Sequence, residues 1–253
     1  MIDIHCHILP SIDDGSKSLE ESIEMARIAE RDGIRKIVAT PHQLEGLYQP
    51  TSETILLKIA LINKTLQDLG SRIEILPGSD VHIAADLVPK IESGEILCIN
   101  RKNYILLEFP NQFVPDRILK LLENLFLKNI IPIITHPERN FLFQRHPNLL
   151  CDMIKAGALT QITAMSITGE FGKEAKKCAK KMLTHGMTHF IASDSHSSNH
   201  RPPVISTCIK HLKKIISDEE IEELVSGNPE MAITGRRIYP REPEKIRTFF
   251  GFF

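Results

Sequence analysis

The sequence predicts an α/β fold whose parallel strands form a barrel or near-barrel, with an open doubly wound sheet as the alternative arrangement. Short apolar segments alternate with longer helical patterns in seven units, each of roughly thirty residues, which is the size of a βαβ repeat. Continuously apolar strands are typical of parallel sheets that are buried on both faces. The chain has 253 residues, the length of one such barrel, so we expect a single domain over residues 1–253.

The first predicted strand begins at the amino terminus, in the segment MIDIHCHILPSIDDG. Its apolar residues alternate with Asp3, His5 and His7, so period-two geometry places the polar side chains on one face. Pro10 ends the strand, and the Asp-Asp-Gly turn after it adds two carboxylates. A lone His-x-His pair is as often structural as metal-binding. Imidazoles and carboxylates gathered within so few residues favour a metal site.

The other expected elements follow in order. Ser18 is a plausible helix cap, and Gly33 and Gly70 end the first two helices. The later strands are expected over residues 36–39, 73–76, 104–107, 130–134, 158–163 and 188–192. The helices are expected over residues 18–32, 52–69, 114–128, 148–156, 172–185, 204–216 and 218–225.

Residues with metal-ligand chemistry follow nearly every predicted strand. Six of the seven strands deliver His, Asp or Glu at the carboxyl end, and only the sixth does not. In parallel α/β folds this edge holds the active site. Nine candidates are too many for one ion and suit two or three ions that share bridging carboxylates. The candidates are His5, His7, Asp14, His42, Asp80, Glu108, His136, Asp194 and His196.

The mixture of five imidazoles and four carboxylates favours Mn, Fe or Zn over Mg or Ca, which prefer oxygen ligands alone. Three divalent ions outweigh four carboxylates in charge, so the pocket should attract an anion such as phosphate. Two arginines lie in the same loops. Arg139, three residues beyond His136, and Arg201 can each hold phosphate oxygens through the guanidinium fork.

Composition argues against several other classes. A net charge of -1 shows no basic bias toward nucleic acid, and no apolar run approaches the ~20 residues of a membrane helix. The five cysteines are scattered, without a Cys-x-x-Cys pair, which suits a reducing cytoplasm. No arginine follows any cysteine by six positions, so a cysteine-dependent phosphatase mechanism is disfavoured. Cys6 alternates away from the histidines and is expected to pack in the barrel wall.

The motifs IDIHCHILP-x-IDDG, ATPHQ, EFP, THPER and SDSH occur in this order. With them, the chain resembles the PHP (polymerase and histidinol phosphatase) superfamily. More narrowly, residues 1–235 are similar to bacterial capsule- and exopolysaccharide-type tyrosine phosphatases. The resemblance implies a distorted (β/α)7 barrel with three divalent ions, usually Mn or Fe. It also implies phosphate contacts for Arg139 and Arg201, and a cytosolic tyrosine-autokinase of polysaccharide export as partner.

The resemblance also implies how the ligands divide among the three ions. The implied sets are His5, His7, Glu108 and Asp194; Asp80, Glu108 and His136; and Asp14, His42 and His196. The chain departs from the family at Asp80, where these phosphatases usually carry the longer Glu. His82, two residues on, could compensate as an extra ligand, although a loop histidine in solvent is the simpler expectation.

We therefore expect one-step hydrolysis of a phosphate monoester, above all phosphotyrosine, by a metal-bridging hydroxide. His42, Asp14 and a metal-bound water are the candidate general acids. Two alternatives stay open: a small ester such as histidinol phosphate or a nucleotide as substrate, or a non-catalytic, metal-stabilised partner of a kinase. Amidohydrolase and deoxyribonuclease barrels also begin with His-x-His but fit the later motifs less well. A cytoplasmic enzyme is expected, with the apolar tail, residues 246–253, peripheral to the barrel or contacting a subunit or membrane surface.

Overall fold

The computed structural model describes residues 1–110 and 112–246. The strands are β1 Ile2–Cys6, β2 Lys36–Ala39, β3 His42–Gln43, β4 Glu74–Pro77, β5 Asp80–His82, β6 Tyr104–Glu108, β7 Ile131–Thr135, β8 Leu159–Thr163 and β9 Phe190–Ala192. The longer helices are α1 Leu19–Arg31, α2 Ser52–Asp68, α4 Ile118–Leu127, α6 Asn148–Lys155 and α8 Lys173–Thr184. The shorter helices are α3 Leu87–Glu92, α5 Phe141–Arg145, α7 Ala164–Thr168, α9 Ser206–Leu212, α10 Asp218–Glu222 and α11 Asn228–Thr234, with 3₁₀ turns η1 Ile99–Arg101 and η2 Pro137–Arg139 and a π-helical turn η3 Glu223–Gly227.

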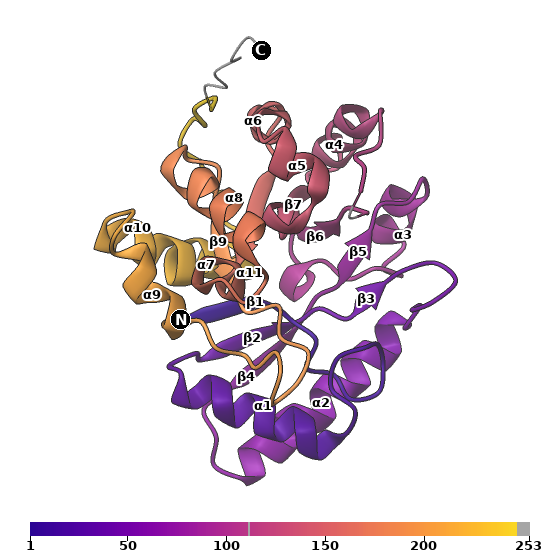
Figure 1. Ribbon diagram of the computed structural model, residues 1–253. Helices are drawn as coiled ribbons and strands as arrows, with labels where there is room; N and C mark the ends of the chain where they lie inside the picture. The colour runs from indigo at the N-terminus through magenta and orange to yellow at the C-terminus, as the bar shows by residue number, and fades with distance from the viewer. Residues whose placement is uncertain (111, 247–253) are drawn as a thin grey trace.

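The elements confirm the predicted α/β class. All paired strands run parallel, and Figure 1 shows α1 and α2 lying outside β2 and β4. The expected helices near residues 204–216 and 114–128 are shorter in the structure. The short helices α3, α5, α7 and α11 escape sequence-based prediction because fewer than about two turns give little periodicity.

The strands form two ladders that follow barrel order. One ladder has the order β1-β2-β4, and the other β3-β5-β6-β7-β8-β9. The chain passes from β2 into β3 through Pro41 and from β4 into β5 through Gly78, so nine short strands correspond to the seven predicted, two of them broken. Proline cannot donate to the ladder. A Cβ on Gly78 would lie 2.7 Å from Cγ1 of Val38, so this close approach requires glycine.

The first and last strands meet at their carboxyl ends. Cys6 and Ser195 form a parallel bridge. The N–H of His7 donates to the carbonyl of Ser195 at 2.8 Å, and the N–H of Asp194 donates to the carbonyl of His5 at 2.9 Å. These bonds join β9 to β1, which is the relation of a distorted barrel and not of an open doubly wound sheet.

Alternate residues of each strand divide the core into two layers. In β6, Tyr104 and Leu106 belong to a buried cluster shared with other strands and with α11. Ile105 and Leu107 instead pack in the cluster that holds the helix side chains. Polar residues that follow the inner-facing positions beyond the carboxyl ends of the strands therefore converge at that end of the barrel, which is called its top below.

Strand β1 departs from strict alternation at its carboxyl end. Ile4 lies in the inner cluster, and the register shifts between Asp3 and Cys6. Beyond this irregularity His5 faces the other predicted ligands, whereas Asp3 accepts a hydrogen bond from the hydroxyl of Ser193 at 2.5 Å. Asp3 therefore does not share the face of the histidines as expected, because the register of β1 shifts between Asp3 and Cys6.

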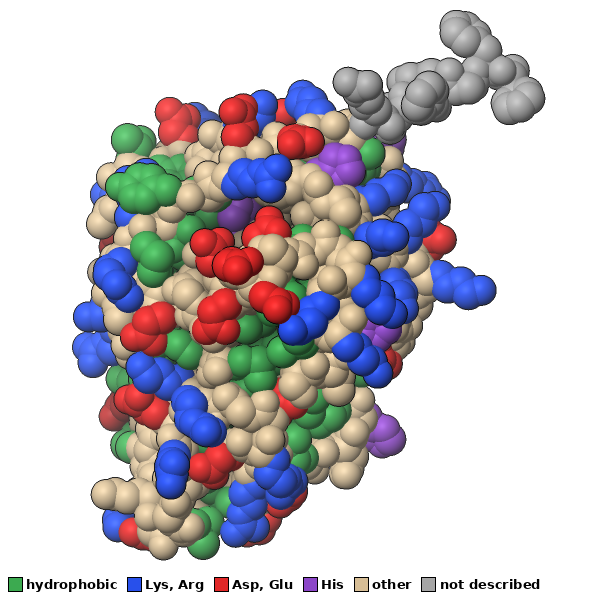
Figure 2. All heavy atoms as spheres, turned by 90° about the vertical axis from the view of Figure 1, so that its left-hand side faces the viewer, with side chains coloured by type: hydrophobic (Ala, Val, Ile, Leu, Met, Phe, Trp, Pro, Cys, Tyr) green, Lys and Arg blue, Asp and Glu red, His purple; other side chains and the backbone are tan. Residues whose placement is uncertain are grey.

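One surface of the molecule carries charge of both signs. Figure 2 shows acidic side chains at the centre of this face and basic ones toward its edges. Among the described residues, no helix is both long and apolar enough to cross a bilayer. The rest of the apolar tail, residues 247–253, lies outside the described residues.

Candidate metal centre

The nine predicted ligand residues gather at one end of the barrel, although His42 and Asp80 begin the short strands β3 and β5 and Asp14 lies in the turn beyond β1. The register of the short strands explains part of this convergence, because His42 on β3 lies opposite Asp80 on β5, and His82 on β5 lies opposite Glu108 on β6. His136 follows β7 directly. Segments far apart in the sequence thus place imidazoles and carboxylates side by side.

The ligand atoms fall into groups whose members all lie within 4.8 Å of one another. Among the described residues these groups are His7, Asp14, His42 and His196; His5, His7 and Asp80; Asp80, Glu108 and His136; and His42, His82 and Glu108. Asp194 adjoins the second group, since its Oδ1 lies 3.5 Å from Nε2 of His5 and 3.6 Å from Nε2 of His7.

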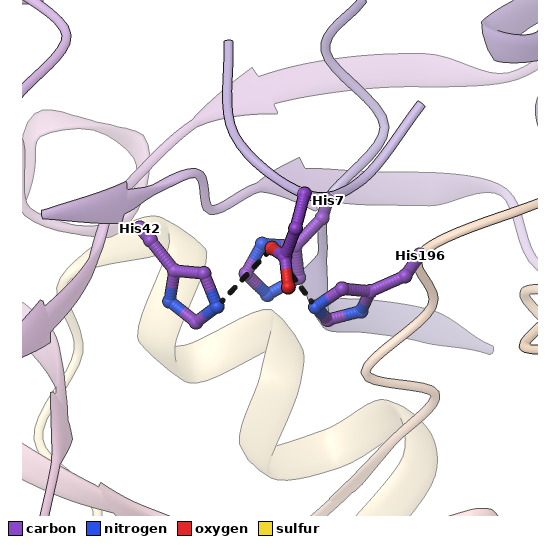
Figure 3. A group of neighbouring side chains, drawn as sticks. His7, His42 and His196 are labelled. Carbon is purple, nitrogen blue, oxygen red and sulfur yellow. Dashed lines mark ion pairs between the residues drawn. The ribbon is translucent and has the colours of Figure 1, made fainter. Parts of the chain in front are cut away.

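The first of these groups contains the implied set of Asp14, His42 and His196. Nε2 of His42 and Nε2 of His196 each lie 3.5 Å from Oδ1 of Asp14. Figure 3 shows His42 and His196 approaching from opposite sides with His7 between them. His7 therefore contributes to this group as well as to the one with His5.

The structure also brings together the other two implied ligand sets, except that one carboxylate in one set is a different residue. Asp80, Glu108 and His136 lie together as expected, with Nε2 of His136 3.4 Å from Oε1 of Glu108. His5 and His7 are accompanied by Asp80 instead of Glu108. Asp80 thus faces two groups, as a bridging carboxylate does.

Hydrogen bonds hold three imidazoles in the tautomer that a metal ion needs. Nδ1 of His7 donates to Oδ2 of Asp13 at 2.8 Å, Nδ1 of His5 to Oε1 of Gln161 at 2.9 Å, and Nδ1 of His196 to the carbonyl of Asp194 at 3.1 Å. In each neutral ring Nε2 then carries the free lone pair. Nε2 of His5 and Nε2 of His7 lie only 3.2 Å apart. A cation bound by both nitrogens would remove the repulsion between their lone pairs.

Several buried polar atoms at the centre fit a metal ion. Both oxygens of Asp80, Oε2 of Glu108 and Nδ1 of His42 are buried without a hydrogen-bond partner among the described residues. Leaving such groups unpaired is costly, and a divalent ion satisfies carboxylate oxygens and imidazole nitrogens together. The residues present therefore fit the metal ions that the sequence predicts.

The pKa shifts divide the ligands into two kinds. Although burial alone would lower them, the pKa of His5 is raised to about 9 by Asp194 and Asp80, and the pKa of His42 is raised to about 9 mainly by Asp80, so each of these two rings gives up a proton when a cation binds. Burial alone would raise the pKa of Asp80, but His5 and His42 hold it well below its usual range. Burial lowers the pKa of His196 to about 2 and that of His136 well below the usual value. Near neutral pH, Asp80 is ionised and both of these rings keep a free lone pair.

Arg139 and Arg201 both face Asp194. Nη1 of Arg139 lies 2.5 Å and Nη2 of Arg201 2.6 Å from Oδ2 of Asp194. Phe171 packs against both guanidinium groups, 4.8 Å from Cζ of Arg139 and 5.4 Å from Cζ of Arg201, measured to the ring centroid. The structure thus brings the two predicted phosphate-contacting arginines together beside one carboxylate.

An uncommon backbone conformation sets the direction of two of the ligand side chains. His136 and Asp194 have φ values of 32° and 51°, in the left-handed region that non-glycine residues seldom adopt. Gly15 packs against the backbone of His7, whose carbonyl a Cβ at position 15 would approach to 2.1 Å. The N–H of Ser16 donates to the same carbonyl at 3.0 Å. The Asp-Asp-Gly turn is therefore held directly over His7.

Sequence-based reasoning missed several residues that orient the predicted ligands. Asp13 was visible only as a turn carboxylate, and Gln161 lies in the strand that offered no His, Asp or Glu. Glu138 is buried, and its Oε1 accepts from the N–H of Thr163 at 3.0 Å and the hydroxyl of Ser166 at 2.6 Å, which fixes the turn between His136 and Arg139. No local pattern could identify such long-range contacts.

His82 does not lie in solvent as expected. It lies on β5 with 24% of its side chain exposed, and its Nε2 is 2.6 Å from Oε2 of Glu108. Cys6, in contrast, lies in the wall as predicted: it is fully buried in the hydrophobic core. Burial raises the pKa of its thiol well above the usual value, so Cys6 is unsuited to act as a nucleophile.

Comparison with known proteins identifies similar chains along the whole sequence. Residues 1–234 match the family model described as "Capsular polysaccharide synthesis, CpsB/CapC". The chain is 37% identical over 255 residues to tyrosine-protein phosphatase YwqE of Bacillus subtilis (strain 168), covering 100% of both chains. It is 30% identical over 243 residues to tyrosine-protein phosphatase CpsB of Streptococcus pneumoniae, covering 94% of this chain and 100% of that protein.

A solved structure agrees with these sequence comparisons. The fold superposes with a TM-score of 0.93 on a crystal structure from work on YwqE of Bacillus subtilis and CpsB of Streptococcus pneumoniae, described as unique metal-dependent tyrosine phosphatases. The two chains are 35% identical, and the match covers 98% of this chain and 100% of the other. The predicted family resemblance is therefore confirmed.

Proposed function

Since the chain belongs to the capsular polysaccharide synthesis CpsB/CapC family, we propose that it is a metal-dependent hydrolase that removes phosphate from phosphotyrosine in a protein of capsule or exopolysaccharide synthesis. One observation carries the proposal. Imidazoles and carboxylates converge at the top of the barrel, and the carboxylate oxygens of Asp80 and Glu108 lie buried there without hydrogen-bond partners among the described residues. That is an arrangement for divalent ions beside an anion.

We assign three divalent ions to the centre, with Mn or Fe as the metal and Zn also compatible with the ligands. The proposed ligands are His5, His7, Asp14, His42, Asp80, Glu108, His136, Asp194 and His196. When bound, the ions supply a nucleophile from water near neutral pH and positive charge for the reacting phosphoryl group.

Two arginines are placed to hold the phosphate, and His42 connects two groups of metal ligands. Arg139 and Arg201 project toward the same point beside Asp194, so they can share their remaining N–H donors with phosphate oxygens as negative charge develops. Nε2 of His42 faces Asp14 and its Nδ1 faces Asp80, so this ring connects two ligand groups. A tyrosine leaving group, with a pKa near ~10, needs less protonation than an alkyl alcohol.

We extend the proposal to the substrate protein, the cellular location and the oligomeric state of the chain. We infer that the substrate protein is a tyrosine-autokinase of polysaccharide export, because the similar proteins YwqE and CpsB are named tyrosine-protein phosphatases. We place the reaction in the cytoplasm, which agrees with the five unpaired cysteines. We also propose that residues 1–253 act as one domain, and that copies of the chain associate into a homo-oligomer.

The direct test compares three substrates with one metal-analysed preparation. Phosphotyrosine peptide, phosphoserine peptide and histidinol phosphate would each be assayed with chelator and with added Mn²⁺. Manganese-dependent phosphate release from phosphotyrosine is expected. Release mainly from histidinol phosphate would move the enzyme to small-metabolite chemistry. Absence of release from all three by the metal-loaded protein would instead favour a non-catalytic kinase partner.

A further inference from the structure

His82 is placed to act on the metal centre although it was expected to lie in solvent. It occupies β5 two residues after Asp80, so both side chains emerge on the same face of the strand. In the parallel ladder His82 lies opposite Glu108 on β6. The register therefore directs its imidazole into the row of predicted ligands.

The contact between His82 and Glu108 does not have the geometry of a hydrogen bond. Nε2 of His82 lies 2.6 Å from Oε2 of Glu108, yet this oxygen is buried without a hydrogen-bond partner among the described residues. The two atoms therefore approach closely without an N–H that points at the oxygen. Two ligands that aim their lone pairs at one cation approach each other in this way.

A third donor completes the group. Nδ1 of His42 lies 3.4 Å from the same oxygen of Glu108, and it too is buried without a hydrogen-bond partner in the described part of the chain. The ligand atoms of His42, His82 and Glu108 all lie within 4.8 Å of one another. Imidazole nitrogens and a carboxylate oxygen are ligands that a zinc-like ion accepts together, so His82 and Glu108 add to the ligand groups that His42 adjoins.

The other contacts of Asp80 and Glu108 leave one carboxylate oxygen of Glu108 next to His82. Oδ2 of Asp80 lies 3.4 Å from Nε2 of His5 and 3.3 Å from Nδ1 of His42, so Asp80 faces the interior groups. Glu108 turns its other oxygen, Oε1, toward His136 at 3.4 Å. Its Oε2 is therefore left for the side of the centre where His82 lies.

We propose that Nε2 of His82 binds a divalent ion directly, together with Oε2 of Glu108, on the side of the centre that the ring of His42 also faces. This chain then has a tenth protein ligand beyond the nine assigned above. The inference rests on the proposed function only in taking divalent ions as residents of the centre. It does not depend on which phosphate ester the enzyme hydrolyses.

The test counts histidine ligands directly in the full chain loaded with Co²⁺. In a proton NMR spectrum, the N–H of each imidazole bound to Co²⁺ gives an exchangeable, strongly shifted resonance. His82→Ala and the bulkier His82→Gln should each remove one such resonance and weaken the affinity for one Mn²⁺ at least about 10-fold. His146→Ala, at an exposed histidine on the loop after α5, should leave the spectrum and the affinity unchanged.

Two results would overturn the inference. The first is retention of every shifted resonance in both His82 variants. The second is an unchanged Mn²⁺ affinity for all sites. Phosphotyrosine hydrolysis by the wild-type protein is measured separately, so a failed proposed function leaves the NMR result interpretable. If His82→Ala unfolds, as judged by circular dichroism, His82→Gln carries the same test because it keeps most of the side-chain volume.

Discussion

Nη1 of Arg139 lies 2.5 Å from Oδ2 of Asp194, although 55 residues separate them in the sequence. Arg201 reaches the same oxygen at 2.6 Å. The two guanidinium groups, aided by His5, hold the pKa of Asp194 well below its usual range although burial alone would raise it. One carboxylate thus fixes both arginines beside the predicted metal ligands.

Replacing Arg139 with Ala should spare metal binding and reduce turnover. The guanidinium is expected to stabilise phosphate oxygens as charge develops, and removing one such donor typically lowers kcat by about 10²- to 10³-fold. Metal content by mass spectrometry and kcat for phosphotyrosine peptide are the two measurements. Arg145→Ala, at an exposed arginine on α5, is the matched control. Equal loss of metal and activity would show that Arg139 supports the metal centre instead.

Replacing His136 with Ala should reduce metal content and activity together. His136 is buried and lies within ligand distance of Glu108 and Asp80, so its loss removes a donor and leaves two carboxylates facing each other. Metal content and kcat would be measured on the same preparation, with His146→Ala as control. A variant that keeps full metal content but loses activity would contradict the assignment of His136 as a ligand.

Asp13→Asn should weaken metal binding without removing any ligand. Oδ2 of Asp13 accepts from Nδ1 of His7 at 2.8 Å and also from the N–H of His42 at 3.0 Å. Outer residues of this kind typically contribute about 10- to 100-fold in metal affinity. Mn²⁺ titration of the variant measures the effect, and Asp116→Asn, on the exposed segment before α4, is the control. Unchanged affinity would mean that the Asp13 charge is not needed to orient His7.

Cys6→Ser should leave turnover largely intact. Cys6 is fully buried, and its thiol has a pKa well above the usual value, so no thiolate is available for attack near neutral pH. Because a hydroxyl in the core costs stability, Cys6→Ala is the second variant, and thermal unfolding accompanies each kcat measurement. A collapse of kcat in both variants without a change in unfolding temperature would overturn the metal-dependent mechanism.

His189→Gln should make the metal-free protein less sensitive to acid. His189 is buried at the start of β9, and burial lowers its pKa to about 3. The unfolded chain therefore binds a proton below its ordinary pKa of 6.5 that the folded chain does not, so the free energy of unfolding falls as pH drops from 6.5 toward 3. The slope is about 1.4 kcal/mol per pH unit for one group.

Urea unfolding between about pH 6 and pH 4 in the presence of chelator tests this slope. His189→Gln should remove most of that contribution, whereas the exposed His200→Gln should behave as the wild-type protein. Identical slopes for His189→Gln and the wild-type protein would show that His189 does not remain neutral in the fold.

The sequence by itself determined the fold class and the positions of the candidate ligands. Parallel strands require apolar segments joined by helices, and functional side chains gather at their carboxyl ends. His5, His136 and Asp194 could therefore be identified from their place within or just after the carboxyl end of a strand. Residue spacing alone likewise argues against thiol chemistry, because no cysteine is followed six positions later by an arginine.

Only the tertiary structure decided how these residues combine. Gln161 meets His5 across 156 residues, and His82 meets Glu108 because two short strands pair in one register. The register of β1 shifts between Asp3 and Cys6, and Asp3 accepts a hydrogen bond from Ser193 instead of joining the ligand groups. Such contacts depend on non-local packing and strand register, which local periodicity does not encode. The sequence thus determined which residues reach the top of the barrel. The tertiary structure determined which of their side chains lie together in each ligand group.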